Sequence, residues 1–186
     1  DRESITINEA SFETFLAQRS GEPDWLKDHR QKNWARFLEL PHPNRKEENW
    51  RFGDPRRFSF GNCSPVTNQQ LDESISNGLK TESSLIPSSA ARIILANDHC
   101  IEEADVPSDL RDSGVIFESF ESALLKRPDE IRLHIESELA DFGSAKQRSL
   151  HAAHCRNGAF LRIPEGVTVE KPFVVYHWIK GSDVAI

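Results

Sequence analysis

Two apolar strands at the C-terminal end of the chain constrain its fold more than any other feature of the sequence. Residues 159–163 and 173–179 are rich in aromatic and β-branched side chains, and a Pro-Glu-Gly turn at 164–166 separates them. Two strands cannot bury a sheet face by themselves. The pattern therefore predicts that apolar side chains such as Ile163, Val174 and Tyr176 are covered by further strands or by another chain, for instance in a homodimer.

The first forty residues read instead as two helices. Asn8 is placed to cap the first helix, whose apolar stripe comprises Phe12, Phe15 and Leu16. The second helix is expected over residues 23–40, because a proline opens it and two prolines follow it. Its apolar face is expected to hold Trp34, Phe37 and Leu38. Trp25 and Trp34 fall on nearly opposite faces of this helix, so one of the two should pack inward.

The middle of the chain divides into two parts. Residues 61–90 contain seven serines and three asparagines with few apolar anchors, which predicts a mobile linker. Residues 91–156 predict a small α+β region with a hairpin of strands 91–96 and 99–104, a strand at 114–117, and helices at 119–125, 128–139 and 149–155. With a helical region at 1–60 and an incomplete β region at 157–186, the expected fold class is mixed α/β.

Charge and composition exclude several classes of protein. Thirty acidic side chains oppose 23 basic ones, so the net charge of −7 excludes a uniformly basic nucleic-acid surface. The longest apolar runs are too short to span a bilayer, and no secretory signal peptide opens the sequence. Three cysteines without a CxxC motif do not form a disulfide framework. We therefore expect a cytoplasmic protein without membrane segments.

The best metal-like cluster in the sequence is His151, His154 and Cys155. Positions i, i+3 and i+4 share one face of a helix, and two imidazoles with a thiolate suit zinc or a soft transition metal. A fourth ligand would have to come from elsewhere, for example from His99 or Cys100. The alternative is that Cys155 packs as a small apolar residue while the histidines lie at the helix surface.

Other motifs favour structural roles. There is no P-loop, GxGxxG, HExxH or GxSxG motif, which argues against an enzyme of those classes. His99 and Cys100 are adjacent on a predicted strand and should point to opposite faces, so they would not form a catalytic pair. In residues 45–60 arginines alternate with aromatics, a pattern that can bind single-stranded nucleic acid. We expect instead that these aromatics pack into the core, because neighbouring acidic residues reduce the local charge.

Two longer motifs carry a family resemblance. Trp25, Arg30 and Trp34 precede residues 40–52, which read LPHPNRKEENWRF. This resembles the signature W…R…W/F…LPxPxRxxExWRY of the SufD branch of the SufB/SufD family, which are scaffold proteins of Suf-type iron–sulfur cluster assembly. Phe52 replaces the usual tyrosine. Residues 158–172 read GAFLRIPEGVTVEKP and resemble the pattern GxxxxVPxGVxVExP, which opens the β-helical core of the family.

The resemblance implies both a fold and a role. The fold would be an N-terminal helical or α+β domain that leads into the first strands of a right-handed parallel β-helix. The role would be that of a non-catalytic scaffold subunit, acting with a SufB-like partner and a SufC-like ABC-type ATPase in a complex that handles an iron–sulfur cluster transiently. No catalytic, metal or cofactor residue is carried over to this segment, and His151, His154 and Cys155 match no motif of the family.

Overall fold

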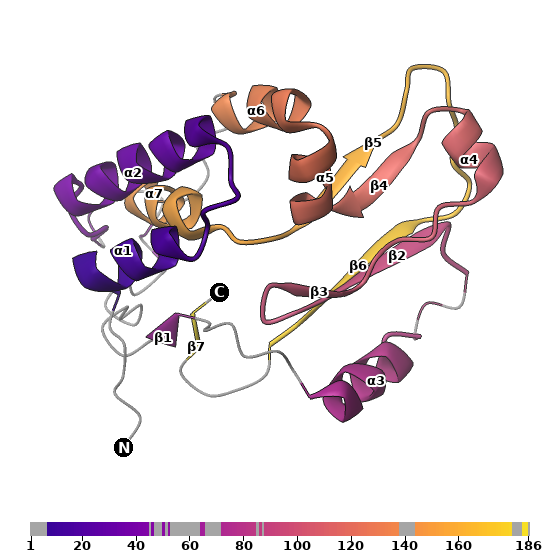
Figure 1. The fold of residues 1–186 in the computed structure, drawn as a ribbon, viewed down its shortest axis with the longest axis horizontal. Coiled ribbons are helices and arrows are strands. Elements are labelled where there is room, and N and C mark those ends of the chain that lie inside the picture. Colours follow the sequence, from indigo (N-terminus) through magenta and orange to yellow (C-terminus); the bar gives the residue numbers. More distant parts are fainter. Residues whose placement is uncertain are drawn as a thin grey trace. The chain divides into compact units, whose positions relative to one another are not determined.

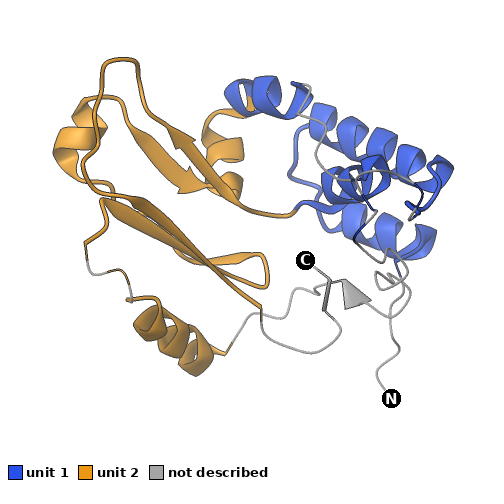
Figure 2. Ribbon diagram, turned by 180° about the vertical axis from the view of Figure 1, so that it is seen from behind, with its two compact units in different colours: residues 1–65, 129–155, 185–186 blue, residues 66–128, 156–184 orange. Residues whose placement is uncertain are grey.

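A computed structural model gives the fold of the chain and describes residues 7–44, 46, 50, 52, 64–65, 72–84, 86, 88–137, 144–179 and 184–185 (Figure 1). Figure 2 colours the two units into which the chain divides. The helical unit comprises residues 1–65, 129–155 and 185–186, and the sheet unit comprises residues 66–128 and 156–184. Both units are thus assembled from segments that are distant in sequence. Two strands of two residues each are β1 (Ser64–Pro65) and β7 (Val184–Ala185).

The helical unit is formed mainly by α1 (Glu9–Ala17), α2 (Asp24–Glu39), α6 (Pro128–Glu136) and α7 (Ala145–His154). Asn8 caps α1, since its side chain accepts a hydrogen bond from the backbone N–H of Ser11 at 3.0 Å. Pro23 precedes α2 at its N-cap position. The two predicted N-terminal helices are therefore confirmed, whereas α7 begins four residues before the position expected from its pattern.

The core of this unit joins the N-terminal helices to α7. Its buried members are Phe12, Trp34, Phe37, Leu150 and Ala153. Trp34 is 3% exposed and stacks on Phe12 with ring centroids 4.7 Å apart, whereas Trp25 is half-buried, as predicted for one inward tryptophan. The prediction that Leu38 shares this face is wrong, because Leu38 is 56% exposed. The buried stripe of α2 ends at Phe37, and the next residue lies about 100° further round the helix.

The sheet unit contains a three-stranded sheet with the order β3-β2-β6. Strands β2 (Ala91–Ala96) and β3 (His99–Glu102) form the predicted antiparallel hairpin. Its two turn residues, Asn97 and Asp98, have φ of 46° and 62°, as a tight two-residue hairpin turn requires. Strand β6 (Phe173–Trp178) lies parallel to β2 in the register Ala91↔Phe173 to Ala96↔Trp178, a pairing that the sequence pattern does not predict.

A second, two-stranded sheet pairs β4 (Ile116–Ser119) antiparallel to β5 (Ala159–Arg162). The two C-terminal strands thus do find partners, β5 through β4 and β6 through β2. Within the described residues, β5 and β6 do not pair with each other, so the β-helix remains a prediction. The apolar core of the unit contains Ala91, Ile93, Leu95, Val106 and Phe117. The mixed α/β fold class is confirmed.

Short helices complete the sheet unit: α3 (Glu73–Glu82), α4 (Ser108–Asp112) and α5 (Phe120–Lys126). Helix α3 lies inside the Ser-rich stretch, where the sequence pattern predicts none. Asp72 caps it, accepting from the backbone N–H of Ser74 at 3.1 Å, and Leu79 is its buried anchor at 2% exposure. The end of the helix is held to β6, because the indole N–H of Trp178 donates to Ser83 Oγ at 2.8 Å.

Candidate functional site

The three residues of the predicted metal cluster are not gathered into a site. His151 lies exposed on α7, whereas His154 is half-buried one turn later and Cys155 caps the helix end. Within the part of the chain that the structure describes, no group of three or more His, Cys, Asp or Glu side chains is arranged to hold a metal ion. The shared helix face predicted from their spacing is therefore not sufficient to form a metal site, because each of the three side chains has different surroundings.

His154 has aromatic neighbours. Its ring centroid lies 5.4 Å from that of Phe12, 5.2 Å from that of Phe15 and 5.4 Å from that of Trp34. Its Nδ1 lies 3.3 Å from the carbonyl oxygen of Leu150, within reach of a hydrogen bond donated by the ring. Burial lowers the pKa of His154 below its ordinary value, and the nearby Arg30 guanidinium lowers this pKa further, while the Leu150 carbonyl raises it. The side chain is thus a packing residue of the core.

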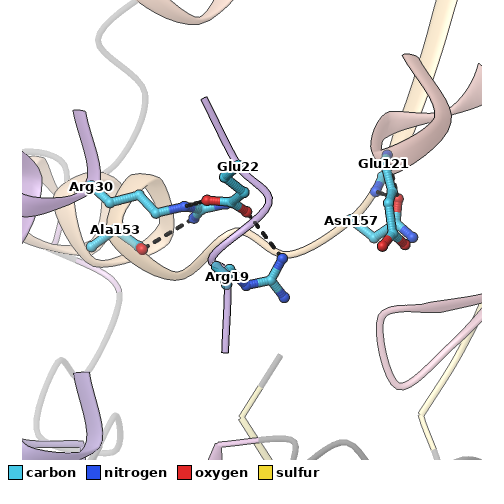
Figure 3. Close-up of polar contacts among 7 residues, drawn as sticks. Arg19, Glu22, Arg30, Glu121, Ala153 and Asn157 are labelled. Atoms are coloured by element: carbon cyan, nitrogen blue, oxygen red, sulfur yellow. Dashed lines mark hydrogen bonds and ion pairs between the residues drawn. The ribbon is translucent and has the colours of Figure 1, made fainter. Parts of the chain in front are cut away.

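A buried arginine lies between α2 and α7. Arg30 is 1% exposed, and its Nε and Nη2 donate to the two carboxylate oxygens of Glu22 at 2.8 and 2.9 Å (Figure 3). Its Nη1 donates to the carbonyl oxygen of Ala153 in the last turn of α7 at 3.2 Å. Glu22 also accepts from Arg19 at 3.1 Å. The bidentate geometry satisfies the buried cation, and the third bond joins it to the partner helix.

A buried lysine makes the reciprocal contact. Lys146, in the first turn of α7, donates from Nζ to the carbonyl oxygens of Phe37 and Leu40 at 2.6 and 2.7 Å. These carbonyls belong to the end of α2, where helical carbonyls lack partners in their own helix. Arg30 and Lys146 together define an antiparallel clamp, in which each helix places a cation on the C-terminal end of the other.

The clamp residues could have been found in the sequence. Arg30 occupies the apolar stripe of α2 with Leu26, Trp34 and Phe37, all four of which are buried. Lys146 shares the buried stripe of α7 with Leu150 and Ala153. A charged residue at a stripe position of each of two helices signals a buried polar contact, although its partner cannot be read from the pattern. Arg30 is also part of the W…R…W motif, and in the structure this arginine has a structural role, since it joins α2 to α7.

The sheet unit has its own polar cluster around Cys100. Glu103 accepts from the backbone N–H of Ser119 at 3.0 Å and from its hydroxyl group. Burial raises the pKa of the Cys100 thiol to about 12, and the neighbouring Glu103 carboxylate adds to this shift. A thiol that stays protonated is a poor nucleophile. Cys100 is therefore unsuited to act as a catalytic nucleophile beside His99.

A buried asparagine organises the passage from α7 to β5. Asn157 is 8% exposed, and its Oδ1 accepts from the backbone N–H groups of Gly158 at 2.9 Å and Glu121 at 3.2 Å (Figure 3). The carbonyl oxygen of Gly158 accepts in turn from the backbone N–H of Phe120 at 3.0 Å. These bonds tie the start of β5 to the first turn of α5, which is a structural role.

One open depression of about 470 Å³ lies in the sheet unit, between the segment after α3 and the β2–β3 hairpin. Arg92, Glu102 and Asp105 are among its lining residues. The guanidinium of Arg92 already donates to Glu102 at 2.7 Å and to the carbonyl oxygen of Ser83 at 3.2 Å. The charge that an anionic ligand would need is thus engaged within the protein.

The basic–aromatic stretch at 45–60 lies largely outside the described residues, as does Cys63. Of this stretch the structure describes residues 46, 50 and 52. Phe52 is 96% exposed, which contradicts the expectation that its side chain packs into the core. Among the helices within the described ranges, none combines the length and apolar character of a membrane-spanning segment.

Comparisons with known proteins agree on one family. The family of the SufBD protein N-terminal region matches residues 11–175. The iron–sulfur cluster assembly protein SufD of Bacillus subtilis is 23% identical over 185 residues, which cover 98% of this chain and 41% of SufD. SufB of the same organism is 26% identical over 180 residues, which cover 91% of this chain and 37% of SufB.

A chloroplastic SufBD family protein of Arabidopsis thaliana is 27% identical over 196 residues, which cover 98% of this chain and 35% of that protein. The chain thus spans 41% or less of the length of these three relatives.

Proposed function

Because the chain belongs to the SufB/SufD family, as its two sequence motifs predicted, we propose that it provides the N-terminal region of a non-catalytic scaffold subunit in Suf-type iron–sulfur cluster assembly. One observation carries the proposal: the family match runs from residue 11 to residue 175 and so passes through both the helical unit and the sheet unit. A match confined to one short motif would have carried no such weight.

The chemistry of the described side chains supports a structural role. The most buried cations, Arg30 and Lys146, hold helices together, and Cys100 is a protonated thiol among packing residues. Polar groups whose hydrogen bonds are satisfied within the protein in this way stabilise a fold rather than act on a substrate. The metal-binding alternative with His151, His154 and Cys155 loses its support, because His154 faces aromatic rings.

The finer parts of the proposal concern the partner proteins and the fold into which strands β5 and β6 lead. We infer a SufB-like subunit and a SufC-like ABC-type ATPase as partners in a reducing cytosol, since relatives named SufD and SufB both match this chain. We also infer that β5 and β6 lead into a parallel β-helix. Leu161, Val175 and Ile179 are 45–61% exposed, and a solenoid repeat buries such a face against its neighbours.

Co-purification tests the proposal. The complete gene is expressed with the SufB-like protein and the ABC-type ATPase of the same genome, and only this chain carries a tag. Size-exclusion chromatography with light scattering then gives the mass of the eluted species. We expect a stoichiometric complex, and a preparation without the SufB-like protein separates direct ATPase binding from binding through that subunit. A folded full-length chain that elutes alone, as a monomer or a homodimer, would overturn the assignment.

A further inference from the structure

His154 lies where helix α1 meets the other helices of the helical unit. Its ring contacts Phe12 and Phe15 of α1 on one side and Trp34 of α2 on another, with centroids 5.2–5.4 Å apart. The remaining described contacts of α1 include the stacking of Phe12 on Trp34 and a bond of 2.7 Å from the Trp34 indole N–H to Glu9. The position of α1 thus depends on a small aromatic cluster, and an ionisable ring lies within it.

The groups around His154 provide little stabilisation for a positive charge on its imidazole ring. From α2 the charged neighbour is Arg30, whose guanidinium repels an imidazolium even though Glu22 pairs with it. From the α1 side, Glu9 is engaged by Trp34, and Arg19 lies over the Phe15 ring at 4.7 Å.

On α7 itself, the Leu150 carbonyl accepts from one ring nitrogen, and the other charged candidate is the exposed His151. Aromatic faces and a helix C-terminus favour a cation to some extent. Burial outweighs them, because the pKa of His154 is lowered.

We propose that His154 is an acid-sensitive latch: its neutral ring holds α1 against α2 and α7, and its protonation releases α1. The contacts of Arg30 with Ala153 and of Lys146 with Phe37 and Leu40 do not involve the imidazole, so the α2–α7 pair stays together. The direction follows from proton linkage. A histidine whose folded-state pKa lies below the unfolded value of 6.5 binds protons more readily when released. The attachment of α1 therefore weakens as the pH falls below about 6.5.

Amide hydrogen exchange tests the latch on the full chain between pH 7.5 and 5.0, with rates corrected for the intrinsic pH dependence of exchange. The titration of the His154 ring is followed in parallel by NMR. We expect the protection of amides in residues 12–17 to fall about tenfold for each unit by which the pKa is lowered, over the pH interval between about 6.5 and the measured pKa of the folded His154 ring. Protection of α2 and α7 should change less than twofold.

Three variants sharpen the experiment. His154→Leu places an apolar side chain among the aromatic rings and removes the titratable group, so the acid-dependent loss of α1 protection should disappear. His151→Gln alters the exposed histidine of the same helix and should behave as the wild type. His29→Leu serves as a second control, because burial and the neighbouring Arg30 also lower the pKa of His29. This variant should keep the acid-dependent loss of α1 protection.

Several results would overturn the proposal. One is α1 protection that stays constant through the measured His154 titration, and another is the same acid response in His154→Leu. Equal loss of protection in α1, α2 and α7 would indicate global unfolding and not release of one helix. If His154→Leu does not fold, the wild-type chain still decides, since a loss of α1 protection that falls outside the pH interval between about 6.5 and the measured His154 pKa contradicts the latch.

Discussion

The ion pair between Glu22 and Arg30 permits a quantitative prediction about the helical unit. Glu22→Gln keeps the size of the side chain and removes the negative charge that faces the guanidinium. Arg30 is 1% exposed and makes two of its three described hydrogen bonds to this carboxylate. In the variant the buried cation keeps the Ala153 carbonyl and, at best, one amide oxygen.

The magnitude follows from the burial of both partners. Removing one member of a buried ion pair typically costs about 3–5 kcal/mol, because the remaining charge has no counterion in a poorly solvated position. Glu22 is 9% exposed, and Arg19 is a second cation beside it. We therefore expect the free energy of unfolding of Glu22→Gln to fall by about 3 kcal/mol, the low end of that range, since the retained amide oxygen offsets part of the loss.

Urea unfolding at pH 7, followed by tryptophan fluorescence and circular dichroism, measures this difference. The matched control is Asp24→Asn at the start of α2. Asp24 is 98% exposed and lies 3.7 Å from Lys27, so its loss should change the free energy of unfolding by less than about 0.5 kcal/mol. A double variant with methionine at positions 22 and 30 should lose less stability than Glu22→Gln, because no uncompensated charge remains.

A Glu22→Gln variant within about 0.5 kcal/mol of the wild type would refute the reasoning, since it would mean that Arg30 finds solvent or another partner. A double variant that is less stable than the single one would also contradict it. That result would show that the ion pair itself contributes more to the free energy of unfolding than is lost when Arg30 is left without a counterion.

Two further predictions concern the other buried groups. Lys146→Met keeps most of the side-chain stem but removes the Nζ group that donates to the carbonyls of Phe37 and Leu40. It should lower the free energy of unfolding by about 2–3 kcal/mol in the same urea assay, and an unchanged midpoint and slope would contradict the clamp. The pKa of the Cys100 thiol is raised to about 12, so this thiol should react with a disulfide reagent at pH 8 at least on the order of 100-fold more slowly than in the denatured chain. The rate is measured in a Cys63→Ser, Cys155→Ser background. Equal rates would show that the thiol is accessible and ionised.

Local signals in the sequence were sufficient for several elements. Asn8 and Pro23 mark helix starts because capping and the fixed φ of proline act within a few residues. Asn97 and Asp98 mark the hairpin because both tolerate positive φ. Helix α3 escaped prediction, since a single deeply buried side chain, Leu79, anchors it among polar residues.

Long-range contacts could not be predicted in the same way. The parallel pairing of β2 with β6 leaves no trace in either strand, because both are short apolar runs that could pair with many partners. The spacing of His151 and His154 shows a common helix face but not the aromatic rings that Phe12, Phe15 and Trp34 bring from the other end of the chain. For that reason the metal hypothesis failed, whereas the family resemblance did not depend on such contacts.

The order in which the ribosome makes these segments has a consequence for biogenesis. Strand β2 emerges early with β3 at one edge, but its other edge must wait for β6. At 5–20 residues per second, the interval is on the order of ten seconds. During this time Ile93, Ile94 and Leu95, each at most 1% exposed in the folded chain, lie on a strand with an open edge. Since α2 likewise waits for α7, both units complete their folding only when residues 145–178 have been translated, and nascent chains that stall before them are the species most prone to aggregate or to need a chaperone.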